Sequence, residues 1–222
     1  HKFSMLFHSS ILFKYLEYKV DVEYVTELKI DGLKIVIEYK DGKLVQAATR
    51  GDGVVGENVT ENILQIKDIP HTISEKKNII VEGEIYLTRK QFNKINSELE
   101  KKGDKVYANP RNLASGTLRQ LDQNAVRERG LSAFIYDLAY APFTINTQEE
   151  ELQYLEKVGF PVSKNRRVCK TIEQVMEFWE MWNSKRDSYH FDIDGTVLKV
   201  NQREYQELLG YTGKAPRFAI AL

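Results

Sequence analysis

The sequence predicts an α+β fold built on mainly antiparallel sheets. Three observations support this class. Apolar and polar residues alternate over residues 24–50, an Asp-Gly pair inside that stretch is typical of a hairpin turn, and helix-start signals separate the later strand-like segments. Strand pairs joined by tight turns, with helices interspersed, favour α+β over a parallel sheet. The 222 residues are enough to bury one sizeable core, and the sequence contains no repeats or low-complexity linker.

The first half of the chain is expected to be rich in strands. Residues 33–40 alternate between apolar and charged side chains, so one face should be buried. Asp41 and Gly42 would form the turn, since both tolerate positive φ. The following elements are expected to be a return strand at 43–49, a glycine-rich loop at 50–53, a short helix near 57–65 that Pro70 limits, and a strand at 78–87.

Three helices are predicted from a threonine followed three residues later by Glu or Gln, the pattern of a capping box. These pairs are Thr88 with Gln91, Thr147 with Glu150, and Thr171 with Gln174. Glycines at 103 and 159 would end the first two helices. The remaining segments are expected to be a loop leading into a short helix at 109–120, strands at 131–141 and 192–200, and a helix near 202–209.

Charge and composition exclude several classes of protein. The 32 basic residues balance 32 acidic ones, which argues against a protein that binds nucleic acid through bulk positive charge, although a local basic groove is still allowed. One cysteine, Cys169, excludes an internal disulfide and indicates a reducing compartment. The histidines lack metal-ligand spacing, so no protein metal site is expected. No apolar run approaches the ~18 residues that span a bilayer. We therefore expect a cytoplasmic protein with no membrane partner.

The segment Glu27-Leu28-Lys29-Ile30-Asp31-Gly32 is the first candidate site. Residues two apart share a strand face, so Glu27, Lys29 and Asp31 should project together. A lysine becomes a nucleophile only when burial or a nearby cation lowers its pKa. Carboxylates on both sides would raise that pKa, and on this segment alone a salt-bridged surface strand is the favoured alternative. Lys199, which ends an apolar strand, could supply the cation, or it could be a solvated edge lysine.

Two further segments could bind a nucleotide or a phosphate. Glu84 emerges from an apolar strand and could accept hydrogen bonds from ribose hydroxyls or hold a metal; ordinary strand alternation explains it equally well. Residues 101–119 carry five basic residues and one acidic residue. Arg111 and Arg119 lie there among small residues, which suits phosphate contact, although a solvated basic loop is the common alternative.

Together these segments resemble the nucleotidyltransferase (adenylation) domain of NAD-dependent DNA ligases. The matching motifs run from about Glu27 to the C-terminus: Glu-Leu-Lys-Ile-Asp-Gly at 27–32, Thr-Arg-Gly-Asp-Gly at 49–53, Gly-Glu-Ile-Tyr at 83–86, Asn-Pro-Arg-Asn at 109–112, Leu-Arg-Gln-Leu-Asp at 118–122, Phe-Asp-Ile-Asp-Gly at 191–195 and Ala-Pro-Arg-Phe-Ala-Ile-Ala at 215–221. The resemblance implies the DNA ligase and mRNA-capping nucleotidyltransferase fold, in which two mainly antiparallel sheets with flanking helices surround a nucleotide cleft.

The resemblance also implies a reaction and a role for each matching residue. Lys29 would attack the α-phosphorus of NAD and form a lysyl-AMP intermediate, and Asp31 would orient Lys29 or assist with Mg²⁺. Tyr136 would stack on adenine, although a core aromatic is the alternative. The remaining nucleotide contacts would come from Glu27, Arg50, Glu84 and Lys199, and contacts to phosphate or DNA from Arg111, Arg119 and Arg186.

The resemblance places the whole chain, 1–222, in one adenylation domain that is truncated at both ends. Residues 1–23 match poorly, apart from a rough correspondence at Met5-Leu6-Phe7-His8. In the full-length protein the partner would be nicked duplex DNA, sealed in replication and repair. The protein is expected to be a monomer, and the fragment alone is not expected to ligate. Two alternatives stay open: an ATP-dependent polynucleotide ligase or capping-type nucleotidyltransferase, and a catalytically degenerate nucleotide- or DNA-binding module.

Overall fold

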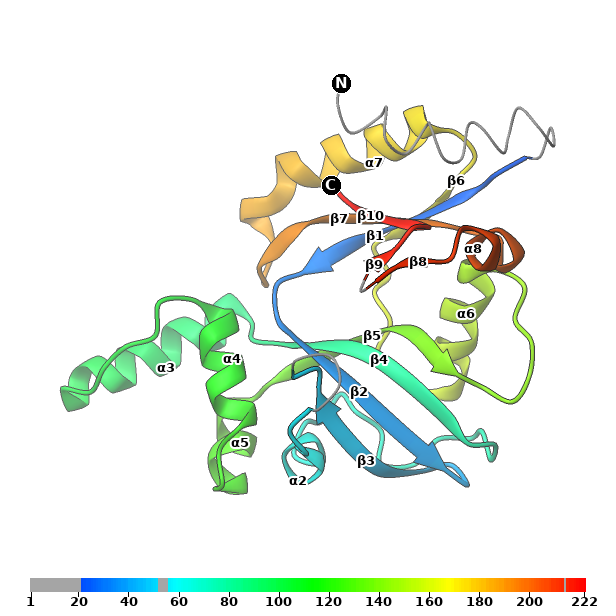
Figure 1. The fold of residues 1–222 in the computed structure, drawn as a ribbon. Helices are drawn as coiled ribbons and strands as arrows, with labels where there is room; N and C mark the ends of the chain where they lie inside the picture. Colours follow the sequence, from blue (N-terminus) through cyan, green and yellow to red (C-terminus); the bar gives the residue numbers. More distant parts are fainter. Residues whose placement is uncertain (1–20, 52–55, 214) are drawn as a thin grey trace.

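Two four-stranded antiparallel sheets form the body of the molecule. The computed structural model describes residues 21–51, 56–213 and 215–222 (Figure 1). The strand orders are β10-β7-β1-β6 in the first sheet and β3-β2-β4-β5 in the second, and a small pair, β8-β9, lies beside them. Figure 1 shows the chain leaving the first sheet at the end of β1 and entering the second at β2. The α+β class with antiparallel sheets is therefore confirmed.

The strands of each sheet come from distant parts of the sequence. The first sheet contains β1 (Tyr24–Ile30), β6 (Arg166–Cys169), β7 (Ile193–Val200) and β10 (Ala219–Ala221). The second contains β2 (Leu33–Lys40), β3 (Lys43–Thr49), β4 (Ile79–Tyr86) and β5 (Ser132–Tyr140). The small pair is β8 (Tyr211–Thr212) and β9 (Ala215–Pro216).

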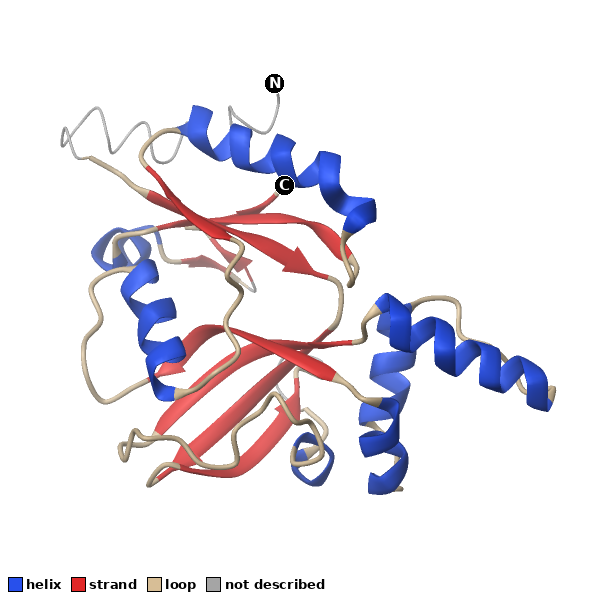
Figure 2. Cartoon of the chain, turned by 180° about the vertical axis from the view of Figure 1, so that it is seen from behind, coloured by secondary structure: helices blue, strands red, loops and turns tan. Residues whose placement is uncertain are grey.

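The helices lie outside the sheets. They are α2 (Thr60–Ile63), α3 (Arg89–Lys102), α4 (Pro110–Leu118), α5 (Gln123–Arg129), α6 (Gln148–Val158), α7 (Ile172–Lys185) and α8 (Arg203–Leu209), with a 3₁₀ turn, η1 (Arg186–Ser188), after α7. Figure 2 shows α7 over the first sheet, α6 on the side where the two sheets approach each other, and α3, α4 and α5 grouped on the opposite side. No helix in the described part of the chain is long and apolar enough to cross a membrane.

The predicted hairpin is confirmed in detail. Asp41 and Gly42 have φ of 50° and 76°, as a turn of this kind requires. Ile35, Ile37 and Tyr39 are fully buried on one face of β2, while Lys40 is exposed. Hydrophobic alternation therefore determined both the register and the buried face of this pair.

The three threonines predicted to begin helices all accept a hydrogen bond from the backbone N–H three residues later. Only Thr147 and Glu150 form the complete reciprocal box. The side chain of Gln91 donates to the carbonyl of Glu128, and that of Gln174 accepts from the backbone of Lys170. Each glutamine reaches a different backbone group, so the threonine alone caps α3 and α7.

Two predictions for the middle of the chain had the wrong bounds. The short helix expected after a loop within 109–120 already begins at Pro110, because Asn109 caps α4 and Pro110 occupies its first turn. The helix expected at 57–65 is reduced to Thr60–Ile63, since Glu57 accepts a backbone hydrogen bond from Thr49 at 3.0 Å. Helix α5, bounded by Asp122 and Gly130, was not predicted, nor were the short strands β8 to β10.

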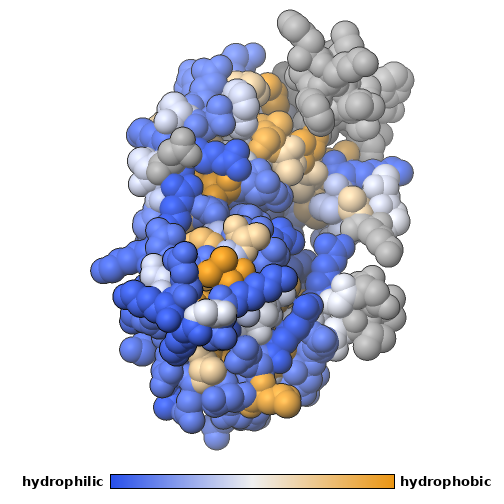
Figure 3. All heavy atoms as spheres, turned by 90° about the vertical axis from the view of Figure 1, so that its left-hand side faces the viewer, coloured by the Kyte–Doolittle hydropathy of each residue, from blue (hydrophilic) through white to orange (hydrophobic). Residues whose placement is uncertain are grey.

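The main core lies against the second sheet. It joins residues of β2 and β4 to Leu113 and Leu118 of α4 and to Leu152 and Leu155 of α6. Separate smaller clusters lie under α7 and around β7. Figure 3 shows that the side of the molecule at the left of Figure 1 is largely hydrophilic, with only small apolar areas. The apolar side chains are thus buried mainly between the helices and the sheets.

We predict that Leu155→Ala lowers the free energy of unfolding by about 2–5 kcal/mol, because it leaves a cavity in the main core. Leu121→Ala is the matched control: this leucine is fully exposed, and its truncation should cost less than about 0.5 kcal/mol. Chemical denaturation of both variants measures the difference. Equal losses would show that α6 does not pack as described.

Candidate active site

Lys29 lies at the end of β1, where the chain leaves the first sheet and continues into the second. Its ammonium forms an ion pair with Asp194 of β7. In the antiparallel register Lys29 stands opposite Gly195, whose φ of 131° leaves the strand irregular beside Asp194. The hydrogen bond from Lys29 holds the pKa of the Asp194 carboxyl below its usual range. The direct partner of Lys29 is therefore Asp194, rather than its sequence neighbours Glu27 and Asp31.

Asp31 and Arg111 bring the start of α4 to the same place. Arg111 Nη1 lies 3.0 Å from Asp31 Oδ1, and Asp31 donates its backbone N–H to the carbonyl of Asp192 at 3.0 Å. Arg111 is in the first turn of α4, which Asn109 caps. Its positive charge also acts on the carboxyls of Glu84 and Asp194, so these groups share one electrostatic environment.

Glu84, on β4, is a desolvated carboxyl near these charges. Burial raises its pKa to about 7, although the positive charges of Arg111 and Lys29 act in the opposite direction. The hydroxyl of Tyr136, on β5, donates to Glu84 Oε2 at 3.5 Å. Glu84 can therefore be either protonated or ionised near neutral pH, and it can donate or accept a hydrogen bond.

Lys199 is largely buried where the two sheets meet, and oxygen atoms of the protein itself surround its ammonium. Its Nζ donates to the backbone carbonyl of Tyr136 at 3.1 Å and lies 3.4 Å from Glu27 Oε2 and 3.7 Å from Asp137 Oδ1. It also lies 5.5 Å from the centre of the Tyr136 ring. Burial alone would lower the pKa of Lys199, but Glu27 and Asp137 outweigh it and raise that pKa.

The partners of Lys199 decide one alternative from the sequence. Lys199 is not a solvated edge lysine, because it pairs with Glu27 and Asp137. Asp137 was not predicted at all, although a charged residue in the middle of the apolar stretch 131–141 was a usable signal. Burial raises the pKa of Glu27, with Lys199 acting against it.

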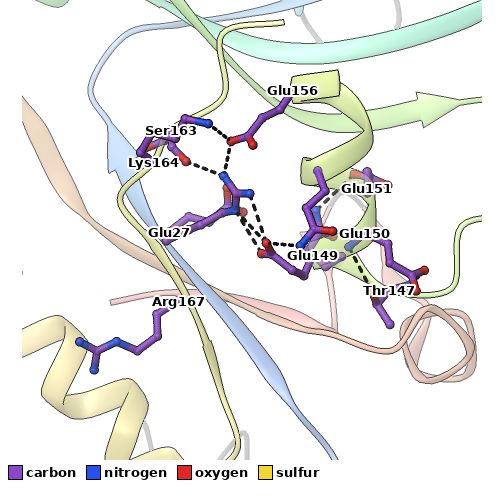
Figure 4. Close-up of polar contacts among 12 residues, drawn as sticks. Glu27, Thr147, Glu149, Glu150, Glu151, Glu156, Ser163, Lys164 and Arg167 are labelled. Carbon is purple, nitrogen blue, oxygen red and sulfur yellow. Dashed lines mark hydrogen bonds and ion pairs between the residues drawn. The ribbon is translucent and has the colours of Figure 1, made fainter. Parts of the chain in front are cut away.

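Arg166, a second residue missing from the prediction, supports Glu27 from the side. It stands opposite Glu27 in the pairing of β1 with β6. Its guanidinium donates to Glu149 at 3.1 Å, to Glu156 at 2.6 Å and to the carbonyl of Ser163 at 3.0 Å. Figure 4 shows Glu149, Glu156 and Ser163, the partners of this guanidinium, around the same place as Glu27. Arg166 thereby attaches α6, which packs on the second sheet, to a strand of the first sheet.

The remaining predicted residues are more peripheral. Arg119 pairs with Glu57 at 2.6 Å, and Arg50 is exposed just after β3. Arg186, in η1, is exposed, and its charge reaches Asp194. Met5-Leu6-Phe7-His8 and residues 52–53 of the glycine-rich loop lie outside the described residues. Within the described ranges no cluster of three or more Asp, Glu, His or Cys side chains could hold a metal ion.

The chain matches one protein family over most of its length. The family model of the NAD-dependent DNA ligase adenylation domain aligns with residues 7–222. A DNA ligase of Clostridioides difficile is 44% identical over 202 residues, which is 90% of this chain and 30% of the relative. A DNA ligase of Petrotoga mobilis is 47% identical over 201 residues, again 90% of this chain and 30% of the relative. The chain thus spans about a third of the length of these curated relatives.

Solved structures show a more distant likeness. A mycobacterial DNA ligase D complexed with ATP and MES is 12% identical, with a TM-score of 0.46 over 81% of this chain and 49% of that chain. That likeness is too low to inform the chemistry of the site.

We predict that Glu84→Gln changes how stability depends on pH. The pKa of Glu84 is raised in the folded protein, so ionisation opposes folding and the wild type should lose stability relative to the variant as pH rises from 4.5 to about 7. Denaturant titrations of both proteins at several pH values measure this difference.

Glu75→Gln is the control of opposite sign. A backbone hydrogen bond from Lys77 lowers the pKa of Glu75, so the stability that its carboxylate contributes should be lost as pH falls below the unfolded value of 4.5. A wild-type minus Glu84→Gln difference that stays constant from pH 4.5 to 7 would show that Glu84 is not desolvated.

Proposed function

Because the chain belongs to the family of NAD-dependent DNA ligase adenylation domains, we propose that it transfers AMP from NAD to Lys29. The Nζ lone pair attacks the α-phosphorus of NAD, and the nitrogen–phosphorus bond forms as the bond to the bridging oxygen breaks. Nicotinamide mononucleotide leaves with that electron pair, and the nitrogen releases a proton. The observation that carries the proposal is the position of Lys29 beside Asp31, Glu84 and Arg111, at the end of the strand that leads from one sheet to the other.

The ion pair with Asp194 supports a specific starting state for this reaction. It holds the Lys29 side chain in place before the nucleotide binds. Since the pKa of Asp194 is lowered, its carboxylate is a poor proton acceptor. Positive charge near a lysine favours the neutral, nucleophilic amine, and Arg111 supplies such a charge at this site. The same cation would stabilise the negative oxygens on phosphorus in the transition state.

The nucleotide is proposed to bind between the two sheets. Glu27 and Lys199 contact the base, Tyr136 stacks on it, and Arg50 and Glu84 hold the ribose. The buried donor and acceptor pair formed by Lys199 and Glu27, next to the Tyr136 ring, supports the assignment of the base. Glu84 is desolvated but not ion-paired in the described contacts, which suits hydrogen bonding to ribose hydroxyls.

Mg²⁺ is proposed as the metal that accompanies the nucleotide, where it would supply positive charge to the phosphates. This ion usually takes one or two protein carboxylates and completes its shell with phosphate oxygens and water. Asp31 and Asp194 flank Lys29 and fit that requirement. In the ligand-free protein their negative charge is balanced by Arg111 and Lys29.

In the native-length protein, AMP is proposed to pass from Lys29 to the 5′-phosphate of a nick in duplex DNA. The 3′-hydroxyl then displaces AMP and seals the strand. Arg111, Arg119 and Arg186 are proposed to contact phosphates of the nucleotide or DNA, and their partly or fully exposed side chains support this role. We further propose a monomeric, cytoplasmic protein that acts in replication and repair, and a 222-residue chain that does not ligate on its own.

We predict that the native-length protein, incubated with NAD and Mg²⁺, gains the mass of one AMP group, about 329 Da by chemical arithmetic, and that Lys29→Ala abolishes this gain. Intact-mass spectrometry measures the adduct. Lys34→Ala is the matched control, since Lys34 also lies near a strand end but pairs with Glu82. An adduct with ATP but not NAD would contradict the proposal, and labelling of Lys29→Ala would show that the nucleophile is another residue.

A further inference from the structure

The Lys199 ammonium has three oxygen partners in the ligand-free protein. It donates a hydrogen bond to the carbonyl of Tyr136, a fixed backbone group, at 3.1 Å, and it forms ion pairs with two movable carboxylates, Glu27 and Asp137. A nucleobase that accepts a hydrogen bond from Lys199 competes with these partners. Which of these oxygen partners gives up its contact with Lys199 determines how the nucleotide can bind.

Asp137 is the acceptor that can leave most easily. Its carboxylate is the more distant of the two, 3.7 Å from Nζ against 3.4 Å for Glu27. Its side chain is 28% exposed, whereas that of Glu27 is 6% exposed. A carboxylate with access to water can give up an ion pair at low cost, but a buried one cannot. Glu27 is also backed by Arg166, whose charge acts on it from β6.

A bulge in β5 places Asp137 in this position. Neighbouring residues of a regular strand point to opposite faces of the sheet. Here Gly83 pairs with Ile135 and the preceding residue, Glu82, pairs with Asp137, so Tyr136 is the extra residue. The bulge allows the ring of Tyr136 and the carboxylate of Asp137 to approach Lys199 together. Such irregularities re-aim side chains, which supports a functional position for Asp137.

We propose that Asp137 is a positioning residue for the nucleotide reaction: it holds the Lys199 ammonium in the empty site and releases one N–H to the base when the nucleotide binds. This role rests on the proposed function of Lys199 as a nucleotide contact. Asp137 also places a negative charge near the path of an anionic dinucleotide. Its removal should therefore favour nucleotide binding while leaving Lys199 less firmly held.

The charged groups around Lys199 determine the sign of a pH effect. Glu27 faces it from β1, Asp137 and Tyr136 face it from β5, and Arg166 acts through Glu27. Its neighbour on β10 is Ala219, and α8 contributes the uncharged Gln206 beside Val200. Asp137 is one of the two carboxylates that raise the pKa of Lys199. Without it, Lys199 should lose its proton at lower pH, and a reaction that needs the ammonium should decline sooner as pH rises.

The test compares Asp137→Asn with Asp137→Glu in the native-length protein. Formation of the AMP adduct is measured against NAD concentration over a range of pH, and thermal melting reports folding. For Asp137→Asn we expect the alkaline limb of the profile to move to lower pH by about half a unit or more, and the KM for NAD to fall at least about two-fold. Asp137→Glu should restore the wild-type limb. Asp104→Asn, an isosteric change in an exposed loop, should alter neither.

A second readout does not depend on activity. NMR titration of the Lys199 side chain in the ligand-free 222-residue chain should give a lower pKa in Asp137→Asn than in the wild type. If Asp137→Asn leaves the alkaline limb or the Lys199 titration where it is in the wild type, the inference is overturned. This holds even if the variant melts at a lower temperature. If the wild type itself forms no adduct on Lys29, the proposed function fails together with this role. Normal wild-type labelling with an unmoved limb overturns the role of Asp137 alone.

Discussion

The buried contact of Lys199 with Glu27 and Asp137 is the interaction on which the site depends. Lys199 and Glu27 belong to one sheet and Asp137 belongs to the other, so this network links the two sheets. Buried charges must keep their partners, because an unpaired buried charge costs on the order of several kcal/mol. The network therefore restricts how far the sheets can separate.

The same constraint explains the arrangement of the other charged residues. The first sheet contributes Lys29 and Asp194, the second contributes Glu84 and Tyr136, and α4 contributes Arg111 at their common edge. Lys29, Arg111 and Lys199 each pair with a carboxylate in the ligand-free protein. A chain with no net charge can thus concentrate cations in one place.

Local sequence signals were reliable where a few neighbouring residues decide the structure. The Asp41-Gly42 turn, the threonine caps and the alternation in β2 all depend on contacts within about one turn or strand pair. Helix α4 begins earlier than the predicted short helix although Asn109 and Pro110 form a good start signal, because its small residues resemble a loop in composition. The helix near residue 60 was overestimated, since pairing of Glu57 with β3 competes with helix formation.

The sequence by itself determined the fold class and the membership of a family whose motifs, including the one around Lys29, recur along the chain. Only the tertiary structure decided which charges meet. Lys29 pairs with Asp194, 165 residues away, rather than with the carboxylates beside it in sequence. Asp137 reaches Lys199 through a bulge that no residue spacing predicts. The physical reason is that strand register and sheet-to-sheet contact are set by long-range pairing, whereas sequence spacing reports only the face of a single strand.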